Sequence, residues 1–378
     1  MQKVWISAIL LIFLSFDIVS AFISSSSSIL FPKHNYNRRV GVLPAASTNN
    51  DSSSGDGTDK KTFITFDVDG TLLTGSGQAA DTSAHARAFS HAVQEVLVAK
   101  GSDTTIPPVA DVLPSHKFHG STDGLILLRL AYATLGIKPN DILEKNQLNK
   151  MMNVMYNYIN KLSDNEISNG LSVLPGVLET LDQLKQDNNV ICGLVTGNVE
   201  GIARRKMNAM GIYQSNALHP PSKTQLELSK NRFKDSQHLA FIGGFGSDYC
   251  SYNINDDTRN YLDRGQQFQI AIERCNETLK EGKGDTALSR VVHVGDAPAD
   301  VLAAKSYALG QLLDETDDDE QQPVKCTVGM VGVATGSYSV EQLTNVAGET
   351  IPGIWEPIIL KEGMKDPMQF INSCLYGK

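Results

Sequence analysis

The sequence is poor in cysteine and tryptophan, and it has no stripe of basic residues. Its 378 residues include 5 cysteines and 2 tryptophans. The cysteines show no CxxC spacing and their number is odd, which favours reduced thiols over a disulfide framework or a zinc site. The net charge is -9. Without a basic surface to neutralise phosphates, we expect no nucleic-acid partner.

Acidic residues are absent between residues 18 and 50, and the N-terminal apolar run is short for a membrane span. Residues 1–21 carry one lysine, an apolar run and then small residues, which predicts a signal peptide. Residues 22–60 are first rich in serine and basic, as in a transit peptide, and then polar, as in a linker. The combination resembles the bipartite plastid presequence of algae with complex plastids. We therefore expect a mature protein in the plastid stroma without a membrane segment; the alternative is secretion.

Two carboxylates end the first predicted strand of the mature chain. Residues 63–66 form a short apolar run that leads into Asp67 and Asp69, with Gly70 after them. A buried strand cannot continue through unpaired acids, so these residues are expected at its carboxyl end, where open α/β sheets bind ligands. Two acids this close repel each other unless a proton or a cation lies between them. The pattern therefore indicates a divalent metal.

Strand and helix patterns alternate through the rest of the mature chain. Strand-like runs lie at residues 190–195, 239–242, 290–294 and 327–335, and helical patterns lie at residues 175–185, 199–210, 264–280 and 298–309. Such alternation predicts parallel βαβ units with right-handed crossovers. The expected fold class is α/β, with a doubly wound, Rossmann-like parallel sheet.

A helical region interrupts this alternation after the first strand. Helical patterns occur at residues 84–99, 122–135 and 140–162, and no strand-like run lies between them. We therefore predict a core at residues 61–83 and 170–378, with an inserted all-helical cap domain at residues 84–169. The acidic stretch at residues 314–320 is expected to be a solvated loop, because its spacing lacks the ordered ligands of a calcium loop.

The polar strand ends suggest phosphoryl-transfer chemistry. Asp67 is ionised at neutral pH and can act as a nucleophile, and Asp69 can exchange a proton with the leaving oxygen and with water. Thr196 offers a hydroxyl group, and the amides of Gly197 and Asn198 lie where a helix begins. Helix N-termini bind phosphate through their N–H groups and the helix dipole.

The fourth strand end adds metal ligands, and a later helix adds a cation. Asp296 and Asp300, together with Asp67, offer hard oxygen ligands that suit Mg²⁺. Phosphoryl transfer also requires positive charge beside the transferred oxygens. Arg264 is the candidate for that charge, and Arg259 is its rival.

The ordered set of DVDGT at residues 67–71, TGN at residues 196–198 and GDAPAD at residues 295–300 resembles the haloacid dehalogenase superfamily. The likeness covers residues 62–339 and is nearest to phosphoglycolate-phosphatase-like members with a helical, C1-type cap. It implies that Asp67 accepts the phosphoryl group and that Asp69 is the acid and base. It also implies phosphoryl contacts from Thr196 and Gly197. Mg²⁺ would be held by the Asp67 and Asp296 carboxylates and the Asp69 carbonyl, with support from Asp300.

The resemblance implies a Mg²⁺-dependent phosphatase for a small phosphorylated metabolite, and 2-phosphoglycolate is one candidate. The alternatives are a phosphomutase acting on a sugar phosphate and a non-catalytic binding protein. Ser121 stands where relatives often carry a basic residue, so Lys117 or His119 could bind a substrate carboxylate instead. Thr122 and Asp123 are expected either to contact the substrate or to cap a helix.

Overall fold

A computed structural model describes residues 60–74, 83–212, 219–220, 222–232, 241–281, 287–313 and 326–377. These residues belong to one compact unit, Gly57–Lys378. The predicted signal peptide, the predicted transit segment apart from Lys60, and the acidic stretch at residues 314–320 lie outside the described residues. No helix in the described ranges combines the length and the apolar character needed to cross a bilayer.

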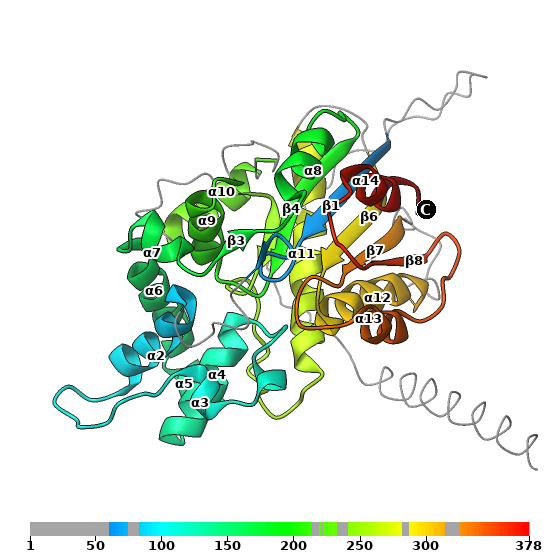
Figure 1. The fold of residues 1–378 in the computed structure, drawn as a ribbon. Coiled ribbons are helices and arrows are strands. Elements are labelled where there is room, and N and C mark those ends of the chain that lie inside the picture. The colour runs from blue at the N-terminus through cyan, green and yellow to red at the C-terminus, as the bar shows by residue number, and fades with distance from the viewer. Residues whose placement is uncertain are drawn as a thin grey trace, which may run out of the picture. The chain divides into compact units, whose positions relative to one another are not determined.

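A parallel sheet forms the core of the described unit (Figure 1). Its spatial order is β5-β4-β1-β6-β7-β8. The strands are β1 Lys60–Phe66, β4 Val190–Thr196, β5 Gly243–Phe245, β6 Ala287–Gly295, β7 Thr327–Val333 and β8 Trp355–Leu360. Numbered along the chain, these strands have the doubly wound order 3-2-1-4-5-6. The predicted fold class is confirmed. The order reverses between β1 and β6, which is where such sheets bind ligands.

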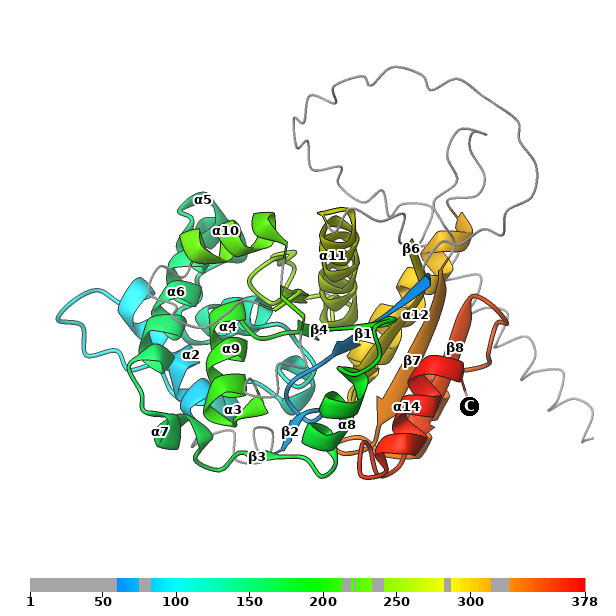
Figure 2. The same cartoon turned by 90° about the horizontal axis from the view of Figure 1, so that it is seen from above.

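Helices cover both faces of this sheet, as Figure 2 shows from above. One face carries α8 Val177–Leu184, α9 Glu200–Ala209 and α14 Pro367–Tyr376, and the other carries α11 Arg259–Glu281, α12 Pro298–Leu313 and α13 Val340–Ala347. Side chains along β1 point alternately to the two faces of the sheet and pack against the helices on each face. The Phe66 ring lies 6.3 Å from that of Phe370 on α14, whereas Phe63 packs in the same cluster as Phe268 of α11. A strand segment buried on both faces is mainly apolar, and so is the buried part of β1, Phe63–Phe66. Its one polar side chain, Thr65, donates a hydrogen bond to the Val292 carbonyl at 3.2 Å.

An all-helical insertion, called the cap below, lies between β1 and β4. Its elements are α2 Ala84–Leu97, α3 Val109–Val112, the 3-10 turn η1 Ser115–Lys117, α4 Asp123–Leu135, α5 Pro139–Glu144, α6 Gln147–Asn160 and α7 Asp164–Ser168. The chain enters and leaves through a short antiparallel ribbon of β2 Leu73–Thr74 and β3 Ser172–Val173. The cap has its own hydrophobic core, in which Met151 and Met155 of α6 are fully buried.

The helix predicted at residues 140–162 is in fact two helices, α5 and α6. Asn146 separates them with a φ of 49°. A residue in the left-handed region interrupts the helical hydrogen-bond ladder, and asparagine tolerates that conformation better than most residues. The apolar spacing runs across the break, because Ile142 and Leu148 both enter the cap core. Periodicity alone therefore could not reveal the break.

Of the strand predicted at residues 239–242, residues 239–240 lie outside the described residues and residues 241–242 are not in a strand. The strand begins directly after them, as β5 Gly243–Phe245. A Cβ atom on Gly244 would lie 1.8 Å from the carbonyl oxygen of Gln267, so helix α11 packs directly on the strand backbone. Glycine is needed for this approach, although its low strand propensity hides the strand. Among the described elements of the core, the sequence analysis missed α10 Lys223–Arg232, α13, α14 and the edge strand β8. It also missed the short elements α3, η1 and α7 of the cap and the ribbon strands β2 and β3.

Candidate active site

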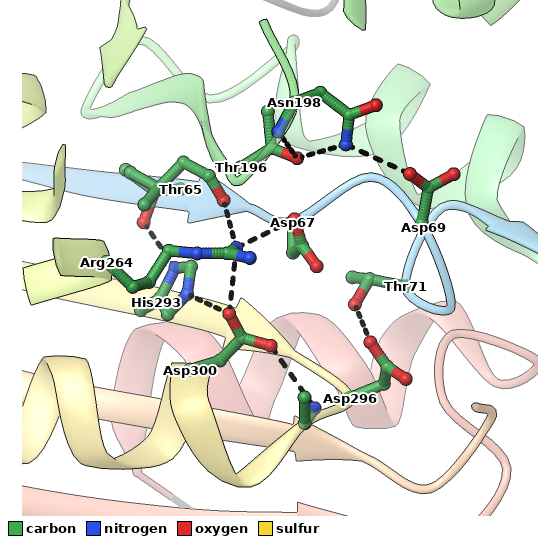
Figure 3. A network of polar contacts seen from close by, with 12 residues as sticks. Thr65, Asp67, Asp69, Thr71, Thr196, Asn198, Arg264, His293, Asp296 and Asp300 are labelled. Carbon is green, nitrogen blue, oxygen red and sulfur yellow. Dashed lines mark hydrogen bonds and ion pairs between the residues drawn. The ribbon is translucent and has the colours of Figure 1, made fainter. Parts of the chain in front are cut away.

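Four acidic residues gather at the carboxyl ends of β1 and β6, beside the switch point of the sheet (Figure 3). Asp67 and Asp69 follow β1, and Asp296 and Asp300 follow β6. One carboxylate oxygen from each of Asp67, Asp296 and Asp300 lies within 4.8 Å of the other two. The Asp67 N–H donates to the Val294 carbonyl at 2.8 Å, which holds the end of β1 against β6. The sheet register thus brings together residues that are more than 200 positions apart in the sequence.

The electrostatics of these acids fit a bound divalent cation. Burial is the main cause that raises the pKa of Asp67 to about 6; Arg264 opposes it, and the charges of Asp300 and Asp69 reinforce it. Burial and repulsion by Asp300 and Asp67 likewise raise the pKa of Asp296 well above its usual range. A cation among these oxygens would remove the repulsion, and carboxylates are the ligands that Mg²⁺ prefers. The Asp69 side chain points away from the cluster in Figure 3, so any metal contact from this residue would fall to its backbone.

Two glycines leave room for the Asp296 carboxylate. A Cβ atom on Gly70 would lie 2.3 Å from Asp296 Oδ2, and one on Gly336 would lie 1.7 Å from the same oxygen. Gly70 also has a φ of 85°, which disfavours any residue with a side chain. The loops after β1 and β7 therefore approach the acidic cluster more closely than other residues would permit.

Arg264 supplies positive charge to this cluster. Its side chain is 3% exposed, and its Nη1 lies 2.9 Å from Asp67 Oδ1 and 3.0 Å from Asp300 Oδ1. Burial acts to raise the pKa of Asp300, but the Arg264 charge and the contacts with His293 and the Ala297 N–H together lower it. Arg259 instead pairs with Asp256 and does not line the cavity described below. Of the two candidate arginines, Arg264 is the one that contacts the predicted nucleophile.

The end of β4 and the loop after it bring Thr196, Gly197 and Asn198 to the same edge of the sheet. Thr196 is fully buried, and its Oγ1 accepts a hydrogen bond from Asn198 Nδ2 at 2.9 Å. Its contact with Asp67 helps to lower the pKa of that carboxyl group. Gly197 and Asn198 line the cavity, just before α9 begins. A Cβ atom on Gly197 would lie 2.3 Å from the Ser121 carbonyl oxygen, so the cap rests on this loop.

Thr122 and Asp123 have structural contacts at the start of α4. Thr122 is the N-cap, since its Oγ1 accepts from the Leu125 N–H at 3.5 Å, and it does not line the cavity. Asp123 does line the cavity, but its Oδ2 accepts from the Val199 N–H at 2.8 Å. The Asp123 N–H donates to the Gly197 carbonyl, also at 2.8 Å. Of the two alternatives for Thr122, the geometry matches the helix cap, whereas Asp123 ties the cap to the phosphate-binding loop predicted from the sequence.

The sequence analysis missed Lys206, a buried lysine on α9. Its Nζ donates to Asp69 Oδ2 at 2.6 Å, to Asn198 Oδ1 at 2.8 Å and to His85 Nδ1 at 3.0 Å. Burial acts to raise the pKa of Asp69, but the charge of Lys206 and the hydrogen bonds from Lys206 and Asn198 lower it. The spacing of the sequence did indicate that Lys206 is buried, because it lies four residues after the apolar Ile202 on the same face of a predicted helix.

Three of the acids and the loop after β4 face a cavity of about 270 Å³ between the core and the cap. The core contributes Asp67, Asp69, Gly197, Asn198, Arg264 and Asp296 to its lining. The cap contributes His85, Phe89, Phe118, His119, Ser121 and Ile126. The lining therefore mixes apolar and polar side chains on the cap side and is mainly charged or polar on the core side. The volume suits a small ligand.

Residues 249–262 pack against the cap loop that contains His119. Lys117 forms an ion pair with Asp257 of this segment and does not line the cavity. Asn260 Nδ2 donates to the His116 carbonyl at 3.0 Å. Of the two basic residues considered for a substrate carboxylate, His119 therefore lies at the cavity and Lys117 holds the loop.

A sequence profile of haloacid dehalogenase-like hydrolases matches residues 62–307. The chain belongs to the haloacid dehalogenase-like hydrolase family. The resemblance drawn from the motifs is thereby confirmed, and so is the expectation that the protein is an enzyme, specifically a hydrolase.

Several solved structures are similar to this hydrolase. A hydrolase from Pseudomonas syringae is 15% identical, with 83% of this chain and 99% of that chain covered and a TM-score of 0.38. A haloacid dehalogenase-like protein from Streptococcus pneumoniae is 12% identical, with 83% and 97% covered and a TM-score of 0.34. A candidate phosphoglycolate phosphatase from Lactobacillus delbrueckii subsp. bulgaricus is 13% identical, with 83% and 98% covered and a TM-score of 0.35. The comparison with curated proteins found no match.

Proposed function

We propose that this hydrolase is a Mg²⁺-dependent phosphatase that acts on a small phosphorylated metabolite. The observation that supports this most directly is that two carboxylates in the lining of one cavity have different partners. Asp67 lies with the acidic cluster and Arg264, whereas Asp69 is bound by Lys206 on the other side. A dehalogenase needs only the first carboxylate, because a halide leaves without a proton. An alkoxide leaving group needs the second as its acid.

In the proposed reaction Asp67 attacks the phosphorus of the bound monoester while Asp69, which takes up a proton in the substrate complex, gives that proton to the leaving alcohol oxygen. The product of this step is an aspartyl phosphate on Asp67. Asp69 then takes a proton from water, which attacks the phosphorus, releases inorganic phosphate and restores Asp67. Arg264 and the amides of Gly197 and Asn198 bind the phosphoryl oxygens during both steps. The cap, with Phe89 and Phe118 in the cavity lining, limits the access of bulk water to the intermediate.

Asp67, Asp296 and Asp300 would hold the Mg²⁺, because their oxygens converge and their mutual repulsion favours a cation. The ion supplies positive charge beside the phosphoryl oxygens when it is bound. The Asp69 carbonyl remains the predicted fourth ligand from the protein.

Within this class, we propose 2-phosphoglycolate as the substrate to test first. A cavity of about 270 Å³ suits a ligand of a few heavy atoms, and His119 lines it on the cap side, where a substrate carboxylate would lie. The plastid address expected from the N-terminus agrees with this choice, since photorespiration produces 2-phosphoglycolate there. Sugar phosphates are the next compounds to assay.

The test is phosphate release by the purified protein from a panel of phosphomonoesters. We expect turnover with Mg²⁺, none with excess EDTA, and none after Asp67→Asn, because the amide cannot form the aspartyl phosphate. Arg259→Met is the matched control and should retain activity. Activity in Asp67→Asn would contradict the mechanism. Formation of an isomer without free phosphate would identify a phosphomutase, and no turnover of any compound would support the non-catalytic alternative.

We also propose that residues 1–60 direct the protein to the plastid stroma. The support is the apolar segment followed by a basic, serine-rich and acid-free segment. A fusion of residues 1–60 to a fluorescent protein should label the plastid in an alga with complex plastids. Fluorescence in the medium would favour secretion instead.

A further inference from the structure

Lys206 is a buried cation whose hydrogen-bonding capacity is fully used. The residue is 2% exposed. An ammonium group has three N–H donors. The three acceptors are Asp69 Oδ2 at 2.6 Å, Asn198 Oδ1 at 2.8 Å and His85 Nδ1 at 3.0 Å. Because a buried charge without partners is costly, this geometry fixes both the ammonium group and the groups around it.

The contacts with Asp69 involve one carboxylate oxygen. Oδ2 accepts from Lys206 and also from Asn198 Nδ2, at 2.9 Å. Oδ1 is buried and has no hydrogen-bond partner among the described residues. The Asp69 side chain is 25% exposed and lines the cavity, so a carboxylate held through Oδ2 keeps one orientation toward a ligand there.

The third partner of Lys206 belongs to the cap. His85 lies on α2, and its Nδ1 accepts from Lys206, so its Nε2 carries the proton. Nε2 then donates to Asp123 Oδ2 at 3.1 Å, and the same oxygen accepts from the Val199 N–H. Two cap side chains are thus linked to the acid–base residue through one lysine of the core.

We propose that Lys206 and His85 form a positioning pair that orients the Asp69 carboxyl group toward the leaving oxygen when the cap rests on the core. This inference depends on the proposed phosphatase function and adds to it the residues that prepare its proton transfer. Neither member of the pair needs to touch the reacting atoms. Without Lys206, Asn198 alone would hold the carboxylate, which could then rotate.

The test compares two substrates that differ in their need for a proton. The alcohol of an alkyl phosphate such as glycerol phosphate needs a proton to leave, whereas 4-nitrophenolate leaves without one. The measured quantity is kcat/KM with saturating Mg²⁺, because it covers the steps up to departure of the alcohol and excludes hydrolysis of the aspartyl phosphate. General acid catalysis contributes roughly 10²–10⁴-fold to such steps. Lys206→Met should lower kcat/KM for the alkyl phosphate by at least about tenfold, and for 4-nitrophenyl phosphate by less than about threefold.

His85 provides a second, independent variant pair on the cap. His85→Asn keeps an acceptor near the position of Nδ1, whereas His85→Gln keeps a donor near the position of Nε2. If the contact with Lys206 is the one that matters, His85→Gln should lower the alkyl-to-aryl ratio of kcat/KM and His85→Asn should preserve it. These variants decide the question even if Lys206→Met does not fold.

Equal losses on both substrates in Lys206→Met, or equal ratios in the two His85 variants, would overturn the positioning role while leaving the phosphatase function intact. Failure of the unmodified protein to hydrolyse either substrate would instead overturn the function on which the inference rests. The two failures are therefore distinguishable in one experiment.

Discussion

Replacing Arg264 by methionine tests whether the site is held together by charge pairing. The Arg264 guanidinium contacts Asp67 and Asp300 at 2.9 and 3.0 Å, and the side chains are 3%, 8% and 0% exposed. Removing one member of a buried pair leaves an uncompensated buried charge and costs about 3–5 kcal/mol. Methionine fills most of the volume, so the loss should come from charge and not from a cavity. We expect the free energy of unfolding in EDTA to fall by about 3–5 kcal/mol.

Mg²⁺ should reduce this loss, because a cation bound by the same carboxylates would neutralise them in the variant. The assay is urea unfolding of both proteins in EDTA and in Mg²⁺, followed by circular dichroism. Arg259→Met is the matched control, since its pair with Asp256 is 31% and 35% exposed. Pairs of that kind contribute about 0–1 kcal/mol. Equal stabilities of the two variants in EDTA would refute the reasoning, and so would a larger loss of stability in Mg²⁺ than in EDTA.

Two further predictions concern stability away from the reacting atoms. Burial raises the pKa of Asp263 from 3.8 to about 6, although hydrogen bonds from Ser251 oppose it. Because the folded-state pKa is raised, the unmodified protein loses stability as pH rises from about 4 to about 6. Over that range the free energy of unfolding of Asp263→Asn, measured in urea, should rise relative to that of the unmodified protein by up to about 3 kcal/mol. A difference that stays constant with pH would contradict the shift. Gly176 and Gly136 have φ values of 80° and 68°. A Cβ atom on Gly176 would lie 1.8 Å from the Met364 carbonyl oxygen, whereas one on Gly136 would meet nothing within 4 Å. Substitution by alanine should therefore lower the free energy of unfolding by about 1–2 kcal/mol at Gly136 and by more at Gly176. Equal losses at the two positions in urea unfolding would show that the close contact at Gly176 relaxes.

Much of the site could be predicted because its motifs are local. Each polar group follows an apolar run, and the carboxyl ends of parallel strands meet at one edge of a sheet. That rule sufficed to bring Asp67, Thr196 and Asp296 together. Arg264 required its place in a helix as well, and the structure shows it against Asp67 and Asp300.

Other parts of the fold carried weaker local signals. Strand β5 contains two glycines, and helix α11 packs on its backbone at Gly244. Because glycine has a low strand propensity, the residue that permits this packing also weakens the strand signal in the sequence. Asn146 breaks a helix whose apolar spacing continues on both sides. Thr122 could be interpreted as a ligand or as an N-cap, and only its distance to the Leu125 N–H distinguishes the two.

The sequence by itself determined the class of fold, the family and the residues at the strand ends, since these follow from periodicity and from short motifs. The tertiary structure decided which charges neutralise one another. Lys206 lies 137 positions from Asp69, and His85 lies 121 positions from Lys206. No spacing rule connects residues so far apart, because their contact depends on how the cap packs on the core. The residue proposed as acid and base was therefore predictable, whereas the pair proposed to orient it became visible only in the fold.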